Sequence, residues 1–157
     1  MISFIVAFDP NQGIGIDGGL PWHIRDDLLL FKQNTLNRHI VMGQTTYDKL
    51  PRKLVDRKIT VVSIDPEYTA EDVEVTHDLI AFLEEHQYDE TEYFICGGAS
   101  IYRQAYPYAT KAYISFVKKE YKVDTYFGVY EESDWDVVKE VDYPEFTYKE
   151  LIRKKAK

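Results

Sequence analysis

The sequence predicts an α/β fold, a three-layer sandwich in which helices flank a twisted, mainly parallel sheet. Apolar runs of strand length alternate with segments of helical spacing, the connections are short, and the last third of the chain is rich in strands. These observations predict about eight strands, with an antiparallel C-terminal edge, and about four helices. No repeat, low-complexity tract or linker divides the chain, so we expect one domain over residues 1–157.

The composition of the chain bears on its binding partners and on its cellular compartment. Lys and Arg number 19 against 27 Asp and Glu, for a formal net charge of -8. Such a chain lacks the cationic field that nonspecific nucleic-acid binding needs, and anionic lipid would repel it, so we expect neither partner. Cys96 has no second cysteine for a disulfide, and no stretch approaches the roughly 20 apolar residues of a membrane span, which predicts a cytoplasmic protein. The four histidines show no metal-ligand spacing, so no metal site is expected.

The first strand, loop and helix follow from the N-terminal residues. Residues 2–8 are almost continuously apolar, as in a strand that is buried on both faces of a parallel sheet. A glycine-rich loop follows, and helical spacing begins after Trp22, which predicts a helix over residues 25–35. The positions that set this spacing are Ile24, Leu28, Phe31 and Thr35.

Two further strands and a short helix come next. Residues 39–42 are predicted as a strand, and Gly43 then begins a turn into a short helix over residues 44–50. Residues 58–63 are rich in β-branched side chains and predict a strand, which breaks at the Asp-Pro pair of residues 65–66.

In the rest of the chain, strands and helices alternate once more, and the last segments are all strands. Residues 73–76 and 93–96 predict short strands, with an amphipathic helix over residues 78–86 between them. A helix over residues 100–106 follows the second of these strands. The tail predicts three more strands, at residues 113–117, 135–141 and 148–152.

Ligands of such sheets bind at the carboxyl ends of the parallel strands, where the strand order switches. These ends fall at residues 9–19, 43–46, 63–65 and 97–100. Residues 13–18 match the pattern G-x-G-x-x-G of many dinucleotide sites, but here the glycines do not open a helix, because Gly19 continues the loop and Pro21 precedes the helical spacing. We therefore favour a mobile loop that lies over a site.

Asp27 is the candidate for a functional carboxylate. It lies between Ile24 and Phe31 on the helical wheel, so its side chain projects from the stripe that faces the interior. A carboxylate there is costly unless a ligand or a polar group meets it. In the alternative interpretation, Asp26 and Asp27 both complement the positive end of the helix. We assign Asp26 to that role and leave Asp27 open between the two. Desolvation would raise the pKa of Asp27, and a cationic ligand would lower it.

Two glycine turns and one basic group are candidates for anion binding. The Gly97-Gly98 pair follows a strand and precedes a helix, which would leave free backbone N–H groups at the sheet edge. Gly43, before Thr45 and Thr46, repeats that arrangement, and two such turns suit an extended diphosphate, although ordinary tight turns have the same pattern. The basic group is either a solvated loop or the source of an arginine that binds a carboxylate through two hydrogen bonds. Its members are Lys49, Arg52, Lys53, Arg57 and Lys58.

Together these residues resemble the dihydrofolate reductase family, over essentially the whole chain. Each landmark is common by itself, but the ordered set at family-like spacing is highly specific. In chain order the landmarks are Gly15, Leu20-Pro21-Trp22, Asp27-Leu28, Phe31-Lys32, Thr35-Leu36-Asn37, Met42-Gly43, Thr46, Leu54, Arg57-Lys58, Gly97-Gly98, Tyr102, Asp124-Thr125 and Phe127.

The resemblance implies an oxidoreductase that reduces 7,8-dihydrofolate to 5,6,7,8-tetrahydrofolate and so supports one-carbon metabolism and thymidylate synthesis. Hydride would pass from a reduced nicotinamide to C6 and a proton would reach N5, while residues 9–24 close over the site. By the resemblance, Asp27 orients the pterin and promotes protonation of N5, Ser115 is linked to that carboxylate, and Trp22 is near the water that completes the network. Arg57 would bind the glutamate α-carboxylate. The implied substrate-binding residues are Ile5, Ala7, Leu28, Phe31, Lys32, Leu50, Arg52, Leu54, Arg57 and Cys96.

On the cofactor side, the resemblance implies NADPH. Ile14 and Tyr102 would lie by the nicotinamide, and Thr46 with the Gly97-Gly98 pair by the diphosphate. The implied cofactor-binding residues are Ala7, Ile14, Gly15, Leu20, Gly43, Gln44, Thr45, Thr46, Ser63, Ile64, Cys96, Gly97, Gly98, Ala99, Ser100, Ile101, Tyr102 and Thr125.

Among the departures of the chain from the family pattern, one concerns the cofactor site and another the loops. Where arginine or a hydroxyl usually surrounds the adenosine 2′-phosphate, the matching residues are Gln44, Ile64 and Ser100, with an acidic residue, Asp65, adjoining them. We therefore expect weak NADPH preference or real use of NADH, with Arg103 as a compensating cation. Val123 replaces the usual glycine before Asp124-Thr125, which bears on the motions of the family's loops and not on the fold.

Two alternative functions stay open from the sequence. One is a fold relative that reduces another pterin or the ribosylamino-pyrimidine of riboflavin synthesis, which would not explain Asp27 and Arg57 together. The other is a folate- or nucleotide-binding protein without turnover, against which Asp27, Thr46 and the Gly97-Gly98 pair argue. The resemblance also favours a monomer and adds antifolate inhibitors to the expected ligands.

Overall fold

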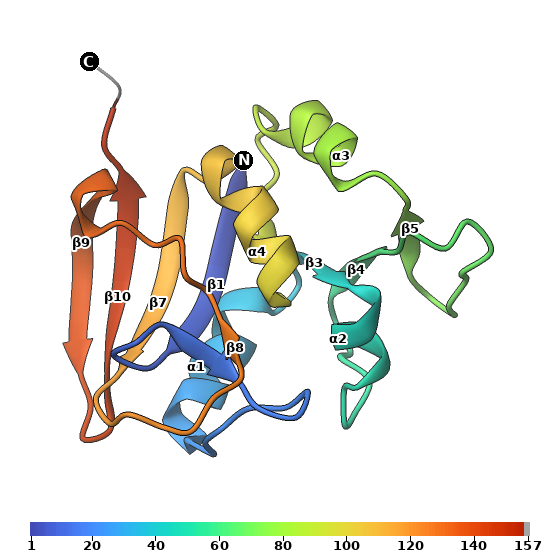
Figure 1. Cartoon of the computed structure of the whole chain (residues 1–157). Coiled ribbons are helices and arrows are strands. Elements are labelled where there is room, and N and C mark those ends of the chain that lie inside the picture. Colours follow the sequence, from blue (N-terminus) through green and yellow to red (C-terminus); the bar gives the residue numbers. More distant parts are fainter. Residues whose placement is uncertain (156–157) are drawn as a thin grey trace.

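The computed structural model describes residues 1–155 and confirms the predicted α/β architecture (Figure 1). One eight-stranded sheet forms the middle layer, in the strand order β5-β4-β3-β6-β1-β7-β10-β9. The parallel strands are β1 (Ile2–Phe8), β3 (His39–Gly43), β4 (Lys58–Val62), β5 (Glu74–Thr76), β6 (Tyr93–Ile95) and β7 (Lys111–Val117). The antiparallel C-terminal edge consists of β10 (Phe146–Arg153), which pairs with β7, and β9 (Trp135–Asp142), which pairs with β10.

The described α-helices are α1 (Arg25–Thr35), α2 (Gln44–Asp48), α3 (Leu79–His86) and α4 (Ala99–Ala105). The bounds of α1 are the predicted ones. α3 begins after Asp78, whose carboxylate accepts a hydrogen bond from the Ala81 N–H and so satisfies one free amide of the first turn. Residues of α3 and α4 belong to the apolar cluster on one face of the sheet, and Leu30 of α1 packs against the cluster on the other face. Within residues 1–155, no helix is both long and apolar enough to cross a membrane.

β1 is central because both of its faces are apolar. Phe4 and Phe8 belong to the cluster on the α4 face, whereas Ile5 and Ala7 pack against the cluster on the α1 face. This is the pattern of a parallel strand that is covered on both sides. The register with β7 places Ala7 opposite Ser115.

Several element ends differ slightly from the sequence prediction. β7 begins at Lys111, before the predicted residue 113, because Lys111 pairs with Ser3 of β1. β10 begins at Phe146, before the predicted residue 148, because Phe146 pairs with Val117 of β7. Long-range pairing therefore extends these strands beyond the residues whose local pattern identifies them.

A second sheet, which the sequence analysis does not predict, pairs β2 (Gly13–Gly15) with β8 (Thr125–Tyr126). Both strands are too short to show a periodicity. This pairing fixes part of the loop that the sequence predicts to be mobile. The loop is also held by a side chain far along the sequence, because the Asp17 N–H donates a hydrogen bond to the Asp124 carboxylate at 3.0 Å. Two 3-10 turns, η1 (Tyr106–Tyr108) and η2 (Glu132–Asp134), are also additions to the prediction.

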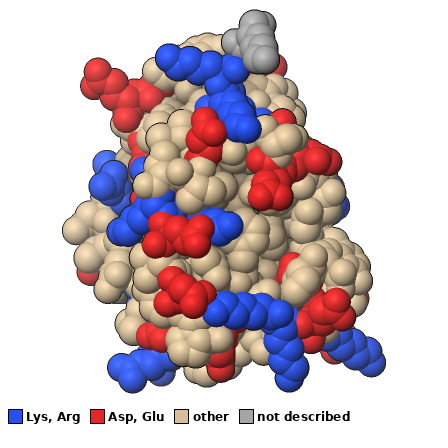
Figure 2. All heavy atoms as spheres, turned by 90° about the vertical axis from the view of Figure 1, so that its left-hand side faces the viewer, with Lys and Arg blue, Asp and Glu red and all other residues tan. Residues whose placement is uncertain are grey.

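β9 is one edge of the sheet and faces solvent along most of its length. Val137 and Val138 are exposed there, but they are followed by Lys139 and Glu140, and acidic and basic side chains are interspersed over this side of the molecule (Figure 2). Charged side chains on an edge strand hinder its pairing with another chain.

Candidate active site

The first turn of α1 brings Asp27 to β7. The Ser115 hydroxyl donates a hydrogen bond to Oδ1 of Asp27 at 2.6 Å, and Ser115 itself is buried. Burial raises the pKa of Asp27, and the Ser115 hydrogen bond opposes that rise only in part. The neighbouring Asp26 is exposed. The inward stripe of the helix therefore carries a carboxylate with one neutral hydrogen-bond partner, as the helical wheel predicts.

Trp22 lies on the same face of the sheet and contributes a buried polar atom. Its ring packs on that of Tyr121, with the two centroids 5.3 Å apart. Its indole N–H is buried and meets no hydrogen-bond acceptor among residues 1–155. Buried donors in folded proteins normally meet an acceptor, so this N–H is oriented for a solvent or ligand atom.

Apolar side chains accompany the polar pair. Ile5, Ala7, Leu50, Leu54 and Cys96 are half-buried and pack against the cluster that contains Trp22. Leu28 and Phe31 are half-buried on α1. The thiol of Cys96 contacts the Phe94 carbonyl oxygen at 3.3 Å, and burial raises its pKa strongly, so it is a small wall residue and not a reactive thiolate.

Arg57 is held at the last turn of α1. Its Nε donates to the Thr35 hydroxyl at 3.2 Å, Nη1 to the Val55 carbonyl at 2.7 Å and Nη2 to the Lys32 carbonyl at 2.9 Å. A guanidinium carries five N–H donors, so the two terminal nitrogens each keep one for a further acceptor. Three protein acceptors therefore hold the guanidinium in place, and two N–H groups remain that could bind the two oxygens of a carboxylate. Arg52, by contrast, is exposed and makes no side-chain hydrogen bond or ion pair with the described residues.

The two glycine turns meet at the carboxyl edge of the sheet. The Gly43 N–H donates to the Gly97 carbonyl at 2.9 Å, which joins the ends of β3 and β6. A Cβ atom at Gly98 would lie 3.3 Å from Oγ1 of Thr46, and one at Gly97 would lie 3.3 Å from the ring of Tyr102. Gly97 also has a φ of +110°, which side chains rarely allow. Bare backbone is thus required at this edge, as in a phosphate-binding cradle.

Several other predicted cofactor residues lie on α4 or on the loop that contains β2. Ile14 and Ile101 pack against the α4-face cluster, Ala99 begins α4, and Leu20 is 55% exposed. The Tyr102 hydroxyl donates to the Ile5 carbonyl at 2.7 Å, which fixes the ring between α4 and β1.

At the ends of β3, β4 and β5, His77 lies beside the predicted cofactor residues Gln44 and Ser63, although the sequence does not predict it there. The Ser63 hydroxyl donates to the Gln44 carboxamide oxygen at 2.6 Å, and Nδ1 of His77 lies 2.9 Å from the Ser63 carbonyl. Ile64 is 94% exposed beside them. Arg103, expected as a compensating cation, instead donates to the Tyr126 carbonyl on β8 at 3.0 Å. A lone histidine after a short strand gives no sequence signal of this contact.

Asp9 is a second residue that sequence reasoning missed. It is 1% exposed, and its carboxylate accepts hydrogen bonds from the N–H groups of Asn11, Gly13 and Tyr121 at 2.9, 2.8 and 3.1 Å. These bonds fasten the start of the loop to the segment after β7. The loop is further shaped by Val123, because a Cβ atom at Gly13 would lie 2.6 Å from its side chain.

Within residues 1–155, no three His, Cys, Asp or Glu side chains are grouped so as to hold a metal ion.

Comparison with known proteins agrees with this geometry. The sequence model of the family "Dihydrofolate reductase" matches residues 1–152. The dihydrofolate reductase of Bacillus subtilis (strain 168) is 38% identical over 138 residues, which cover 88% of this chain and 82% of that protein. Dihydrofolate reductase type 3 of Salmonella typhimurium is 36% identical over 144 residues, covering 92% and 88%.

A solved structure shows the same fold. The Enterococcus faecalis dihydrofolate reductase, complexed with NADP(H) and RAB-propyl, superposes with a TM-score of 0.87 at 29% identity, covering 99% of this chain and 97% of that one. None of these relatives favours the two alternative functions. On the match of its sequence over residues 1–152 and of its fold, the chain belongs to the dihydrofolate reductase family.

Proposed function

We propose that this chain reduces 7,8-dihydrofolate to 5,6,7,8-tetrahydrofolate with NADPH as the hydride donor. The observation that carries the proposal is the pair of Asp27 and Ser115 on the apolar face of the sheet, 2.6 Å apart. The family match, over residues 1–152, supports the reaction class.

Asp27 has the position and the environment to bind the reacting ring. A carboxylate cannot donate hydride, so its part is to accept hydrogen bonds from the N–H groups of the pterin, orient the ring and favour the protonated N5. The Ser115 hydroxyl holds one oxygen of that carboxylate in place. We propose that Trp22 binds the water molecule that delivers the proton, because its buried indole N–H has no acceptor among residues 1–155.

Arg57 is the proposed anchor for the other end of the substrate. Its two remaining N–H groups match the two oxygens of a carboxylate, and the carbonyls of Val55 and Lys32 hold the fork before binding. Leu28, Phe31, Leu50 and Leu54 are the proposed apolar walls between the two polar ends. Lys32 and Arg52 are exposed, and we propose them only as peripheral contacts.

The glycine turns fit the cofactor. Gly97 and Gly98, beside Thr46, leave the bare backbone that a diphosphate requires. We place the nicotinamide by Ala7, Ile14 and the fixed ring of Tyr102. When bound there, the reduced nicotinamide supplies the hydride to C6. The loop that contains β2 covers the site and excludes water.

The test is the near-ultraviolet absorbance of NADPH with purified protein, with and without dihydrofolate, and with the product identified by mass spectrometry. We expect oxidation that requires dihydrofolate and falls about a hundredfold or more in Asp27→Asn. Asp26→Asn removes the same charge from the exposed neighbour and should keep the wild-type rate. Equal rates in the two variants, or no dihydrofolate-dependent oxidation, would rule out the proposal.

We also propose weak NADPH preference or real use of NADH. Gln44, Ile64 and Ser100 offer no cation to a 2′-phosphate, the acidic Asp65 adjoins them, and Arg103 is engaged with β8. A free 2′-hydroxyl suits such a setting better than a dianion. The ratio of kcat/KM for the two cofactors decides this point, and a large ratio in favour of NADPH contradicts it.

Finally, we propose a single-domain monomer in the cytoplasm that also binds antifolate inhibitors. The charged edge strand β9 supports the monomer, and the lack of a second cysteine in the sequence supports a reducing compartment. Light scattering coupled to size exclusion would measure the mass, and a dimer at micromolar protein would contradict the assignment.

A further inference from the structure

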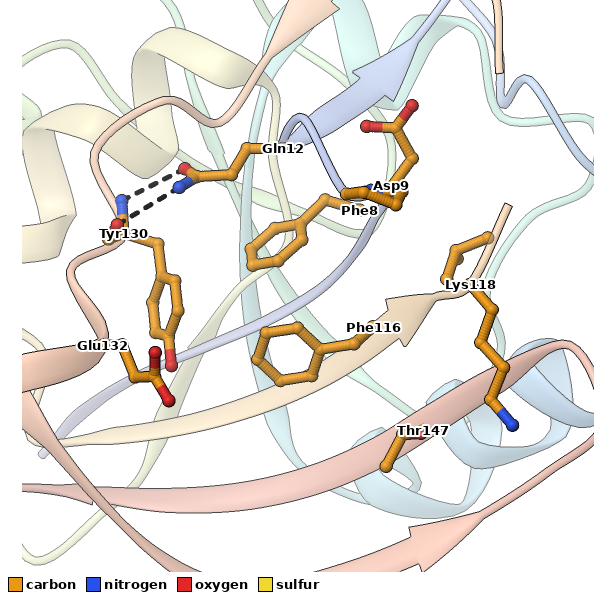
Figure 3. A pocket seen from close by; sticks show the side chains of 10 residues that line it. Phe8, Asp9, Gln12, Phe116, Lys118, Tyr130, Glu132 and Thr147 are labelled. Atoms are coloured by element: carbon orange, nitrogen blue, oxygen red, sulfur yellow. Dashed lines mark hydrogen bonds between the residues drawn. The ribbon is translucent and has the colours of Figure 1, made fainter. Parts of the chain in front are cut away.

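A cavity of about 440 Å³ is lined by residues of β1, β7 and β10 and of the loops beside them (Figure 3). Its aromatic lining comes from Phe8 of β1, Phe116 of β7 and Tyr130. Phe116 follows Ser115 in the strand, and successive side chains of a strand point to opposite faces. The cavity and the catalytic pair therefore lie on the two sides of one strand, and the dihydrofolate reaction uses only one of them.

The three aromatic rings form a corner at this cavity. The centroids of Phe8 and Phe116 are 5.3 Å apart at 85°, those of Phe8 and Tyr130 are 5.6 Å apart at 47°, and those of Phe116 and Tyr130 are 5.8 Å apart at 64°. Such crossed rings offer both faces and edges to a ligand. Aromatic faces carry negative potential and attract cations.

The charge at the cavity is negative. Glu132 lines it and has no ion pair or side-chain hydrogen bond among residues 1–155. Lys118, also in the lining, is neutralised elsewhere, because its ammonium lies 2.7 Å from the Asp142 carboxylate and donates to the Tyr143 carbonyl. Burial, together with the charge of Glu132, raises the pKa of Tyr130 to about 12, so its hydroxyl stays a neutral donor. The Asp9 carboxylate already accepts hydrogen bonds from three backbone N–H groups, so Glu132 is the carboxylate of the lining that is open to a ligand.

The molecule itself places a cation on one of these rings. The ammonium of Lys149, on β10, lies 5.0 Å from the centroid of Phe116 and 3.7 Å from the Glu140 carboxylate. Tyr130 and Glu132 are a second ring and carboxylate in the lining, and the charge of Glu132 acts on the Tyr130 hydroxyl, while no Lys or Arg of the described residues lies over the Tyr130 ring. The volume suits a small aromatic molecule.

We propose that this cavity binds small planar organic cations, such as aryl amidines and aryl guanidines, with the aromatic body against Phe8, Phe116 and Tyr130 and the charge toward Glu132. The site is separate from the substrate and cofactor sites and does not depend on the proposed reaction. A neutral molecule of the same shape would lose the attraction to the carboxylate.

Gln12 makes the site observable from the active-site loop. Its carboxamide donates to the Tyr130 carbonyl at 3.1 Å and accepts from the Tyr130 N–H at 3.2 Å (Figure 3). Gln12 precedes β2, so this pair of hydrogen bonds joins the loop to the wall of the cavity. A molecule that contacts Tyr130 therefore changes the magnetic environment of the Gln12 side-chain amide.

Benzamidine is a suitable probe, and benzamide is its neutral analogue. Because an amidinium would also bind the Asp27 carboxylate, the titration is done on protein saturated with folate, by two-dimensional proton–nitrogen NMR. We expect benzamidine to shift the signals of the Gln12 side-chain amide and the Tyr130 backbone amide, and benzamide to leave them unchanged at the same concentration.

Two surface variants complete the test. Glu132→Gln removes the carboxylate and should weaken the benzamidine affinity about twofold to fivefold, as for an exposed charge pair. Glu131→Gln makes the same change at the adjacent residue, which does not line the cavity, and should bind as the wild type does. Equal affinities of benzamidine and benzamide, an unchanged affinity in Glu132→Gln, or shifts confined to the Asp27 site would each overturn the proposal.

Discussion

Asp27 and Asp26 are adjacent residues of one charge type with different environments. The helical pattern separates them, because only Asp27 lies on the stripe that faces the sheet, and the structure places it against Ser115 while Asp26 stays exposed. Asp9 and His77 could not be found in this way. The partners of Asp9 are backbone N–H groups, one of them 112 residues away, and backbone groups leave no pattern in a sequence.

The raised pKa of Asp27 predicts a gain in stability for the neutral variant. Because burial raises this pKa above its ordinary value of 3.8, the folded protein holds the proton more tightly than the unfolded chain does. The resulting stabilisation is full below that ordinary value and is lost as pH rises through the folded pKa. Asp27→Asn should therefore have a higher free energy of unfolding than the wild type at neutral pH.

Urea unfolding at several pH values checks this expectation. The advantage of Asp27→Asn should disappear as the pH falls below the ordinary carboxyl pKa, and Asp26→Asn should show no such pH-dependent gain. A variant that is less stable than the wild type at neutral pH would mean that the site compensates the buried charge fully.

Ser115 predicts the direction of a second pKa change. Its hydroxyl hydrogen bond lowers the pKa of Asp27 against the effect of burial. Ser115→Ala should therefore raise that pKa further, as followed by carbon NMR of the Asp27 carboxyl group, whereas Ser115→Thr keeps the hydroxyl and should leave it near the wild-type value. A lower pKa in Ser115→Ala would contradict the hydrogen-bond assignment.

Elements with a strong period were predicted and elements that depend on distant partners were not. α1 has the predicted bounds because three apolar positions and the buried Thr35 recur at helical spacing, and β1 is an almost continuous apolar run. β2 and β8 are strands of three and two residues, and only their pairing defines them. The G-x-G-x-x-G pattern in this region therefore belongs to a strand and turn and opens no helix.

The close packing of Val123 against Gly13 of β2 predicts that a larger side chain at position 13 can be compensated by a smaller one at position 123. A Cβ atom at Gly13 would lie 2.6 Å from Cγ2 of Val123, so Gly13→Val should lower the free energy of unfolding by about 1–3 kcal/mol through overpacking. The added change Val123→Gly should restore part of that loss. Gly19→Ala, whose new Cβ would meet its nearest atom at 3.9 Å, is the control and should change little. Additive losses in the double variant would contradict direct contact.

In the whole molecule, the parallel topology explains why the candidate site residues come from distant parts of the chain. The strand order places β6 and β1 between β3 and β7, so the Gly43 turn, the Gly97-Gly98 turn and Ser115 lie along a few adjacent strands. The sequence predicts this gathering from the alternation of strands and helices. It does not predict the cavity on the opposite face, because Phe116 and Tyr130 come from segments whose packing depends on β8 and β10.

In the proposed mechanism the Asp27 carboxylate promotes protonation of N5, and the pH dependence of hydride transfer shows whether it does. Single-turnover rates would be measured for the wild type and Asp27→Asn, with dihydrofolate and NADPH, from neutral to acidic pH. If the carboxylate serves protonation, solvent protons replace it in acid, so the deficit of Asp27→Asn should shrink steadily as the pH falls. A deficit of constant size at every pH would show that Asp27 only positions the ring and would contradict the claim.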